Sequence, residues 1–85
     1  MAALSIRSGI SRVRTDYGDV ILDEGKGFYW HANPTAVLVL DTIVEGGDAD
    51  QAVERIVEEF GIDQSTARSD VETLLGHLRK LEVVR

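Results

Sequence analysis

The fold is decided in residues 27–36, GFYWHANPTA, where the chain changes from the pattern of a strand to that of a helix. Phe28 to Ala32 is an aromatic run of strand length. Asn33 is a favoured helix N-cap, and Pro34 costs nothing at the first helical position because that N–H has no partner within a helix. The sequence therefore predicts a strand at about residues 27–32, followed directly by a helix.

Two more strands are predicted before this point. Residues 10–15 roughly alternate and are rich in β-branched side chains, and residues 19–23 hold a second short apolar segment. Residues 16–19, DYGD, have the chemistry of a turn, because glycine accepts a positive φ and aspartate bonds its own local backbone. Residues 23–27, DEGKG, end the second strand in the same way. Short strands joined by tight turns predict a three-stranded antiparallel sheet.

The rest of the chain predicts three helices, because apolar residues recur every three to four positions. The first helix is apolar on nearly all sides and should be central. Gly46-Gly47 ends it, a capping-box-like start at Asp48 opens the second helix, and Gly61 ends that one. Strands that precede helices in this way indicate an α+β fold, which we expect to be winged-helix-like. The predicted helices cover about residues 34–45, 49–60 and 64–81.

Length and composition limit the class of protein. Eighty-five residues form one domain, which we expect to span residues 1–85, with residues 1–8 flexible. The chain has no cysteine, so no disulfide framework can form. Its longest apolar run, Ala36 to Leu40, is far shorter than a membrane span, and the N-terminus lacks a signal-peptide pattern. We expect a cytoplasmic protein that does not bind membranes.

Patterns of catalytic or metal sites are absent from the sequence. His31 and His77 are the only histidines, and a metal site needs three or four ligands. Gly25-Lys26-Gly27 is too short for a phosphate-binding loop and falls in a predicted turn. No nucleophile, base and orienting group follow a recognisable pattern. We therefore expect a protein that is not an enzyme and carries no metal or cofactor.

The aromatic strand is the most informative candidate site. Neighbouring side chains of a strand point to opposite faces, so Phe28 and Trp30 share one face, and Tyr29 and His31 share the other. Helices on one side of the sheet would bury only one of these pairs, and the sequence leaves open which one. An aromatic strand edge that stays open suits a peptide that adds as a further strand. The alternative is that the aromatic side chains simply fill the core.

Residues 27–36 resemble the G-x-Y-x-x-L-N-x-T-A stretch of the PqqD-like family of peptide-recognition elements. Residues 40–47, LDTIVEGG, are similar to the L-L-x-G helix end of that family. Residues 70–78, DVETLLGHL, are similar to its D-V-x-x-F-L-x-x-L segment. The resemblance covers about residues 10–84, and the order and spacing of these pieces make it specific.

The resemblance implies a winged-helix-like fold that binds the leader segment of a ribosomally synthesised precursor peptide. The leader would pair antiparallel with the third strand, in a cleft between that strand and the third helix. A free-standing chain of this size looks like the leader-binding part of a split lasso-peptide system. Its partners would be a cysteine protease that removes the leader and an ATP-dependent macrolactam synthetase. A peptide chaperone for a radical-SAM enzyme is the close alternative.

The candidate peptide-binding residues come from the third strand and the third helix. Val71, Leu74 and Leu78 would form the floor of the cleft or, alternatively, belong to the core. Leu74 stands where the family commonly has an aromatic residue, and Ala32 where it usually has a bulky aliphatic one. The polar members of the helical set would meet polar groups of the leader. The full set is Phe28, Tyr29, Trp30, His31, Ala32, Asp70, Val71, Leu74, His77 and Leu78.

A winged-helix DNA-binding protein is the main rival from another class. Its recognition helix would be residues 63–80, and a DNA-binding surface needs basic residues to neutralise phosphates. The chain instead has a net charge of −6, residues 41–63 are acidic, and Asp70 and Glu72 would face phosphates. A neutral or cationic peptide is therefore favoured over nucleic acid. A structural subunit of a larger complex is a third possibility.

Overall fold

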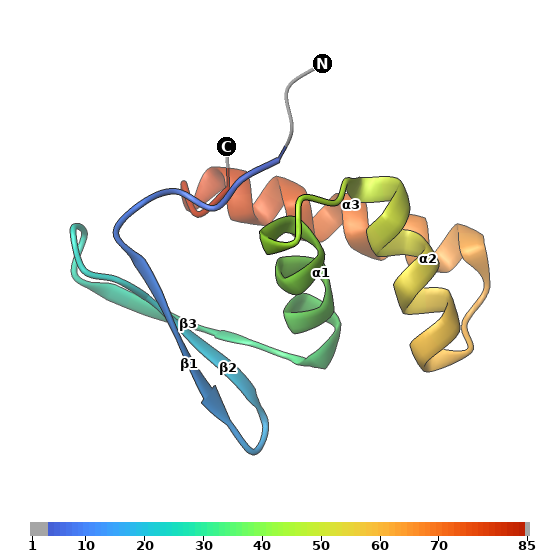
Figure 1. The fold of residues 1–85 in the computed structure, drawn as a ribbon, viewed down its shortest axis with the longest axis horizontal. Coiled ribbons are helices and arrows are strands. Elements are labelled where there is room, and N and C mark those ends of the chain that lie inside the picture. Colours follow the sequence, from blue (N-terminus) through green and yellow to red (C-terminus); the bar gives the residue numbers. More distant parts are fainter. Residues whose placement is uncertain (1–3, 85) are drawn as a thin grey trace.

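The computed structural model describes residues 4–84 and has three strands followed by three helices (Figure 1). The predicted α+β order is confirmed, and no predicted boundary differs from the observed one by more than one residue. The elements are β1 (Ile10–Thr15), β2 (Gly18–Asp23), β3 (Phe28–Ala32), α1 (Pro34–Val44), α2 (Ala49–Phe60) and α3 (Gln64–Lys80).

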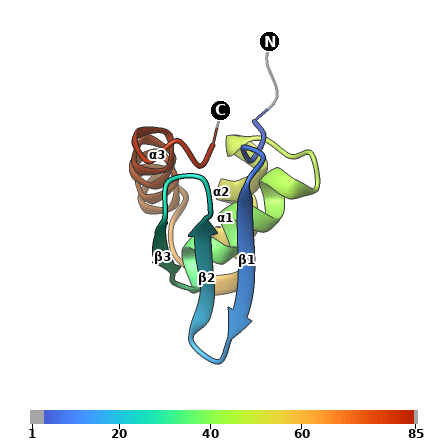
Figure 2. The ribbon, with the colours of Figure 1, turned by 90° about the vertical axis from the view of Figure 1, so that its left-hand side faces the viewer.

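The strands form one antiparallel sheet in the order β1-β2-β3, so β2 is central and β3 lies at an edge. The helices lie behind this sheet in Figure 2, and no helix of residues 4–84 covers its other face. The hairpin of β1 and β2 extends away from the helices, as a wing would (Figure 1). The sheet therefore has one face on the core and one face open to solvent.

The alternation of β3 decides which aromatic side chains face the helices. Ala32 is buried at the end of the strand and Trp30 is half-buried, so this set points inward with Phe28. Tyr29 is 66% exposed and His31 is also exposed, so they lie on the open face of the sheet. The core alternative is therefore wrong for Tyr29. Of the two pairs that the sequence could not tell apart, Phe28 and Trp30 face the helices, and Tyr29 and His31 face solvent.

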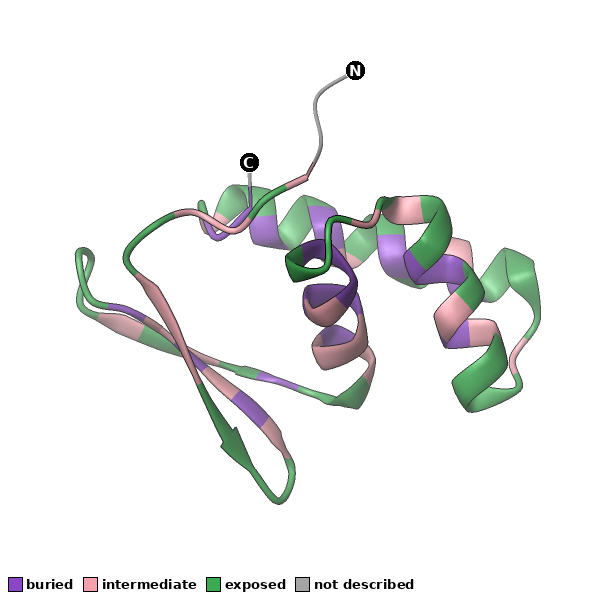
Figure 3. Ribbon diagram, in the orientation of Figure 1, coloured by how far each residue is buried: buried purple, intermediate pink, exposed green. Residues whose placement is uncertain are grey.

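The helices end where local chemistry predicts. The Asn33 side chain accepts a hydrogen bond of 2.9 Å from the Ala36 N–H and caps α1. Asp48 and Gln51 form a complete capping box at the start of α2, and Gly61, at φ 66°, ends that helix in the left-handed region. Figure 3 shows that the buried residues of the helices lie on their inner sides. The α1 helix is central, as expected, with its apolar residues Val39, Leu40 and Ile43 buried.

Two buried carboxylates on the inner face of β2 are held by arginines. Asp19 accepts hydrogen bonds from Arg12, whose guanidinium also contacts Asp41 at 2.7 Å and so joins the sheet to α1. Burial alone would lower the pKa of Arg12, but its hydrogen bonds to Asp41 and Asp19 outweigh burial and raise it. Asp23, only 1% exposed, is bound by Arg7. The Arg12 pairs fix the β1–β2 hairpin to α1, and the Arg7 pair fixes the N-terminal segment to β2.

The first residues contact the end of the chain. Ile6 forms an isolated bridge with Val84, and the Arg7 N–H donates to the carbonyl of Val83 at 2.8 Å. These contacts do not measure motion, so the expected flexibility of residues 1–8 stays a prediction. Residues 1–3 lie outside the described residues.

Arg7→Ala is expected to lower the free energy of unfolding by about 3 kcal/mol, because it leaves the buried Asp23 carboxylate without its charged partner. Urea denaturation followed by circular dichroism measures this change. Arg14→Ala is the matched control, since Arg14 is 72% exposed and Asp19 keeps its contact with Arg12. We expect the control to cost less than about 1 kcal/mol. If Arg7→Ala and Arg14→Ala lower the free energy of unfolding equally, the burial of Asp23 does not make its ion pair the more important one.

Candidate peptide-binding groove

The main-chain groups of β2 are divided between its two neighbours. The N–H of Glu24, just after β2, donates to the carbonyl of Gly9, just before β1, at 3.3 Å. Glu24 therefore directs its main-chain groups to the β1 side. In an antiparallel ladder, alternate residues direct their N–H and C=O groups to opposite sides. Asp19, Ile21 and Asp23 therefore direct theirs to β3.

The partners of these residues show which groups of β3 remain open. Phe28, Trp30 and Ala32 stand opposite the β2 residues that bond to β3. By the same alternation, Tyr29 and His31 direct their N–H and C=O groups away from β2. No strand within residues 4–84 pairs with that side of β3. The structure thus has an open edge with two donors and two acceptors spaced as in a strand.

A hollow of about 440 Å³ lies where α3 passes the end of β3. The ring of His77, which lines the hollow, has its centroid 6.0 Å from that of the Trp30 ring. Further along, Lys26 and Glu82 form an ion pair of 2.6 Å that joins the turn after β2 to the segment that follows α3. The hydrogen bond from Lys26 lowers the pKa of the Glu82 carboxyl group. We call the hollow of about 440 Å³ the β3–α3 groove, and its lining residues are Asn33, Thr35, Asp70, Thr73, Leu74 and His77.

Three of the predicted helical residues meet in this groove. Asp70, Leu74 and His77 follow one another at helical spacing and form one wall. Leu74 is half-buried and supplies apolar surface, while Asp70 and His77 supply polar groups. The groove therefore offers both an apolar contact and two polar ones beside the open strand edge.

Three other candidates belong to the core. Val71 and Leu78 are 0% exposed, and Ala32 is only 2% exposed. The core alternative therefore holds for Val71 and Leu78. Their side chains offer no surface to a peptide.

The exposed pair of β3 lies on the open face of the sheet. The rings of Tyr29 and His31 meet edge to face, with centroids 6.0 Å apart. Their side chains therefore point away from the helices, and it is their main-chain groups that lie along the open edge. Trp30 and Phe28 project towards the helix side of that edge.

Sequence reasoning missed three lining residues, Asn33, Thr35 and Thr73. Thr73 lies three positions after Asp70 and four before His77, so helical spacing was a usable signal for it. Asn33 and Thr35 lie around the start of α1, where the N-cap role of Asn33 accounts for the local sequence by itself. Their place in the groove depends on how α3 packs beside this point.

Other kinds of site find no support in the part of the chain that the structure describes. Within residues 4–84, no three His, Cys, Asp or Glu side chains are grouped so as to hold a metal ion. None of the helices there combines the length and the apolar character that crossing a membrane requires. What the site does offer is a row of open main-chain donors and acceptors at a strand edge, which suits an extended chain.

The sequence of most of the chain matches the model of one protein family. The family model described as "Coenzyme PQQ synthesis protein D (PqqD)" matches residues 19–84. The match begins in β2 and includes β3 and all three helices. No curated protein matches the chain in sequence.

Two solved structures are similar to the whole fold. One is described as "Lasso peptide synthetase B1 complexed with the leader peptide", with 28% sequence identity and a TM-score of 0.90, and the match covers 99% of each chain. The other is described as "TbiB1 in Complex with the TbiA(beta) Leader Peptide", with 21% identity and a TM-score of 0.88. It covers 95% of this chain and 94% of the other, and at this identity the likeness shows the fold alone.

Proposed function

This chain belongs to the PqqD family, and we propose that it binds the leader segment of a ribosomally synthesised precursor peptide. The observation that carries the proposal is the open edge of β3, formed by the N–H and C=O groups of Tyr29 and His31, in a strand that leads directly into Asn33 of the β3–α3 groove. The 28% identical structure, which is described with a bound leader peptide, supports it.

The leader adds as a fourth strand, antiparallel to β3. Its main chain bonds to Tyr29 and His31, and because strand side chains alternate, every second leader side chain points towards α3. There Leu74 and the ring of Trp30 offer apolar contact, and Asp70 and His77 offer polar contacts. Main-chain bonds supply affinity for an extended chain, and the groove supplies selectivity for particular side chains.

The protein acts as a single cytoplasmic domain that presents its bound peptide to other enzymes. Its partners are a cysteine protease that removes the leader and an ATP-dependent macrolactam synthetase, as in lasso-peptide maturation. The description of the 28% identical structure favours this pathway over a chaperone for a radical-SAM enzyme. Nucleic acid is disfavoured, because the net charge of −6 would repel phosphates.

Trp30→Ala is expected to weaken leader binding about 30-fold, because it removes the largest apolar side chain next to the groove. Fluorescence anisotropy of the labelled leader peptide encoded with this protein measures the affinity, and circular dichroism checks the fold. Tyr17→Ala is the control, since Tyr17 is an aromatic residue that is 90% exposed at the tip of the β1–β2 hairpin. If Trp30→Ala keeps its fold and binds the leader with unchanged affinity, the groove is not part of the leader-binding site.

A further inference from the structure

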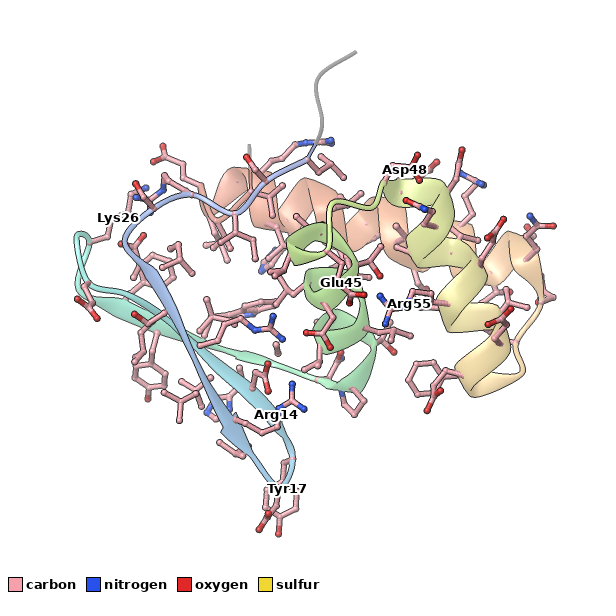
Figure 4. The ribbon with its side chains drawn as sticks, viewed as in Figure 1. Arg14, Tyr17, Lys26, Glu45, Asp48 and Arg55 are labelled. Carbon is pink, nitrogen blue, oxygen red and sulfur yellow. The ribbon has the colours of Figure 1, made fainter. Side chains whose placement is uncertain are left out.

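The charged side chains of the sheet lie on the face that packs against the helices. Because side chains alternate along a strand, Arg12 and Arg14 share this inner face with the buried Asp19 and Asp23. Figure 4 shows Arg14 on the side of the hairpin that faces the helices. An antiparallel sheet with one face in solvent is usually apolar inside and polar outside. This sheet departs from that rule, so the core does not account for the residues on its open face.

The open face of the sheet is apolar and aromatic instead. Tyr29 is 66% exposed and Val13 is 50% exposed, while Val20 and Leu22 are half-buried. Within the three described strands, no acid, lysine or arginine points to this face. We define the open-face patch as the residues Ser11, Val13, Val20, Leu22, Tyr29 and His31.

The open-face patch is ordered in two rows that cross the sheet and end at the open edge of β3. The register of the strands places Ser11, Leu22 and Tyr29 in one row and Val13, Val20 and His31 in the other. A strand that pairs with β3 places one residue opposite Tyr29 and another opposite His31, and directly opposite residues share a face of the sheet. Such a strand therefore extends both rows by one side chain.

We propose that the open-face patch selects the leader through these two positions, so that the protein contacts both faces of the bound leader. The proposal rests on the strand addition proposed above. The free main-chain groups of the edge belong to Tyr29 and His31. The two leader residues that bond to these groups are therefore the same two whose side chains lie on the patch. The leader residue between them, opposite Trp30, points towards α3.

The patch favours uncharged leader side chains that are aromatic or β-branched. The rings of Tyr29 and His31 already meet edge to face, with centroids 6.0 Å apart. An aromatic or β-branched side chain opposite Tyr29 gains a cross-strand contact with that ring. A charged side chain at the same place would lose water against apolar surface and find no opposite charge in the patch. The leader that fits is apolar at three consecutive positions, whereas the groove by itself would select only every second residue.

Tyr29→Thr is expected to weaken leader binding about fivefold, because it removes the ring from the patch. Threonine keeps the strand propensity and the main-chain N–H. Tyr17→Thr is the matched control and should keep wild-type affinity, since Tyr17 is 90% exposed and lies at the tip of the β1–β2 hairpin (Figure 4). Fluorescence anisotropy of the labelled leader encoded with this protein measures the affinities, and circular dichroism checks the fold.

A serine scan of the same leader separates the two faces. With the wild-type protein, serine is expected to weaken binding at three consecutive leader positions. With Tyr29→Thr, the loss at one of the two patch-facing positions is expected to disappear, while the loss at the groove-facing position between them stays. If sensitivity to serine falls only on every second leader position, the patch does not select the leader.

Three other outcomes have definite meanings. If Tyr29→Thr binds the leader as tightly as the wild type does, the role of the patch is wrong and strand addition stands. If the wild type is a dimer that Tyr29→Thr dissociates, the patch binds a second copy of this chain, and the proposal is overturned. If the wild type binds no leader at all, the failure lies in the proposed function itself.

Discussion

His31→Pro is expected to weaken leader binding by about 100-fold while leaving the domain folded. Proline has no N–H, and the N–H of His31 points to the open edge where the leader would bond. The leader would lose one hydrogen bond and meet the proline ring in its path, a combined cost of about 2–3 kcal/mol. The fold tolerates the change, because a proline whose missing N–H faces away from the sheet breaks no ladder bond.

Two further variants separate the main chain from the side chain in this experiment. His31→Ala keeps the N–H and removes only the imidazole, so we expect it to bind the leader within a few-fold of the wild type. Trp30→Pro has its missing N–H on the β2 side and should destabilise the sheet itself. Anisotropy titrations with the labelled leader give the affinities, and urea denaturation gives the stabilities. If His31→Pro and His31→Ala bind equally well, strand addition is wrong.

Gly18→Ala is expected to lower the free energy of unfolding by about 3 kcal/mol or more. A Cβ at this position would stand 2.2 Å from the carbonyl oxygen of Ala32, and φ is +127°, which side chains rarely adopt. The clash involves a main-chain oxygen and the φ angle belongs to the main chain, so no change of side-chain rotamer relieves either of them. Since Ala32 ends β3 directly before Asn33 of the groove, partial unpairing here should also reduce leader affinity.

Gly76→Ala is the matched control for this stability measurement. Gly76 lies within α3, and a Cβ there would meet nothing within 4 Å. Alanine is the better helix former, so the control should raise the free energy of unfolding by about 0.5–1 kcal/mol. Urea denaturation measures both variants. A Gly18→Ala protein as stable as the wild type would mean that the turn before β2 can move away from β3.

Much of the fold follows from short-range chemistry that can be read along the chain. Asn33-Pro34 fixes the change from strand to helix, because capping involves groups within four residues of one another. The same holds for the capping box of Asp48 and Gln51 and for Gly61 at the end of α2. These signals explain why every predicted boundary lies within one residue of the observed one.

The site was predicted less completely. Helical spacing brings Asp70, Leu74 and His77 together, and the resemblance to the PqqD-like family pointed to the strand beside them. The spacing alone could not separate Leu74, which lines the groove, from Val71, which lies wholly in the core. Both are apolar and one turn of helix apart, and only the packing of α3 against its neighbours distinguishes them.

The sequence by itself determined the elements, their order and the alternation of the aromatic strand, because these depend on contacts between near neighbours. Only the tertiary structure decided that Trp30 faces the helices and that the main-chain groups of Tyr29 and His31 lie along an open edge. It also decided that Asn33 and Thr35 share a hollow with α3. These facts depend on which face of the sheet the helices cover, and residues far apart in the chain settle that by burying the most apolar area together.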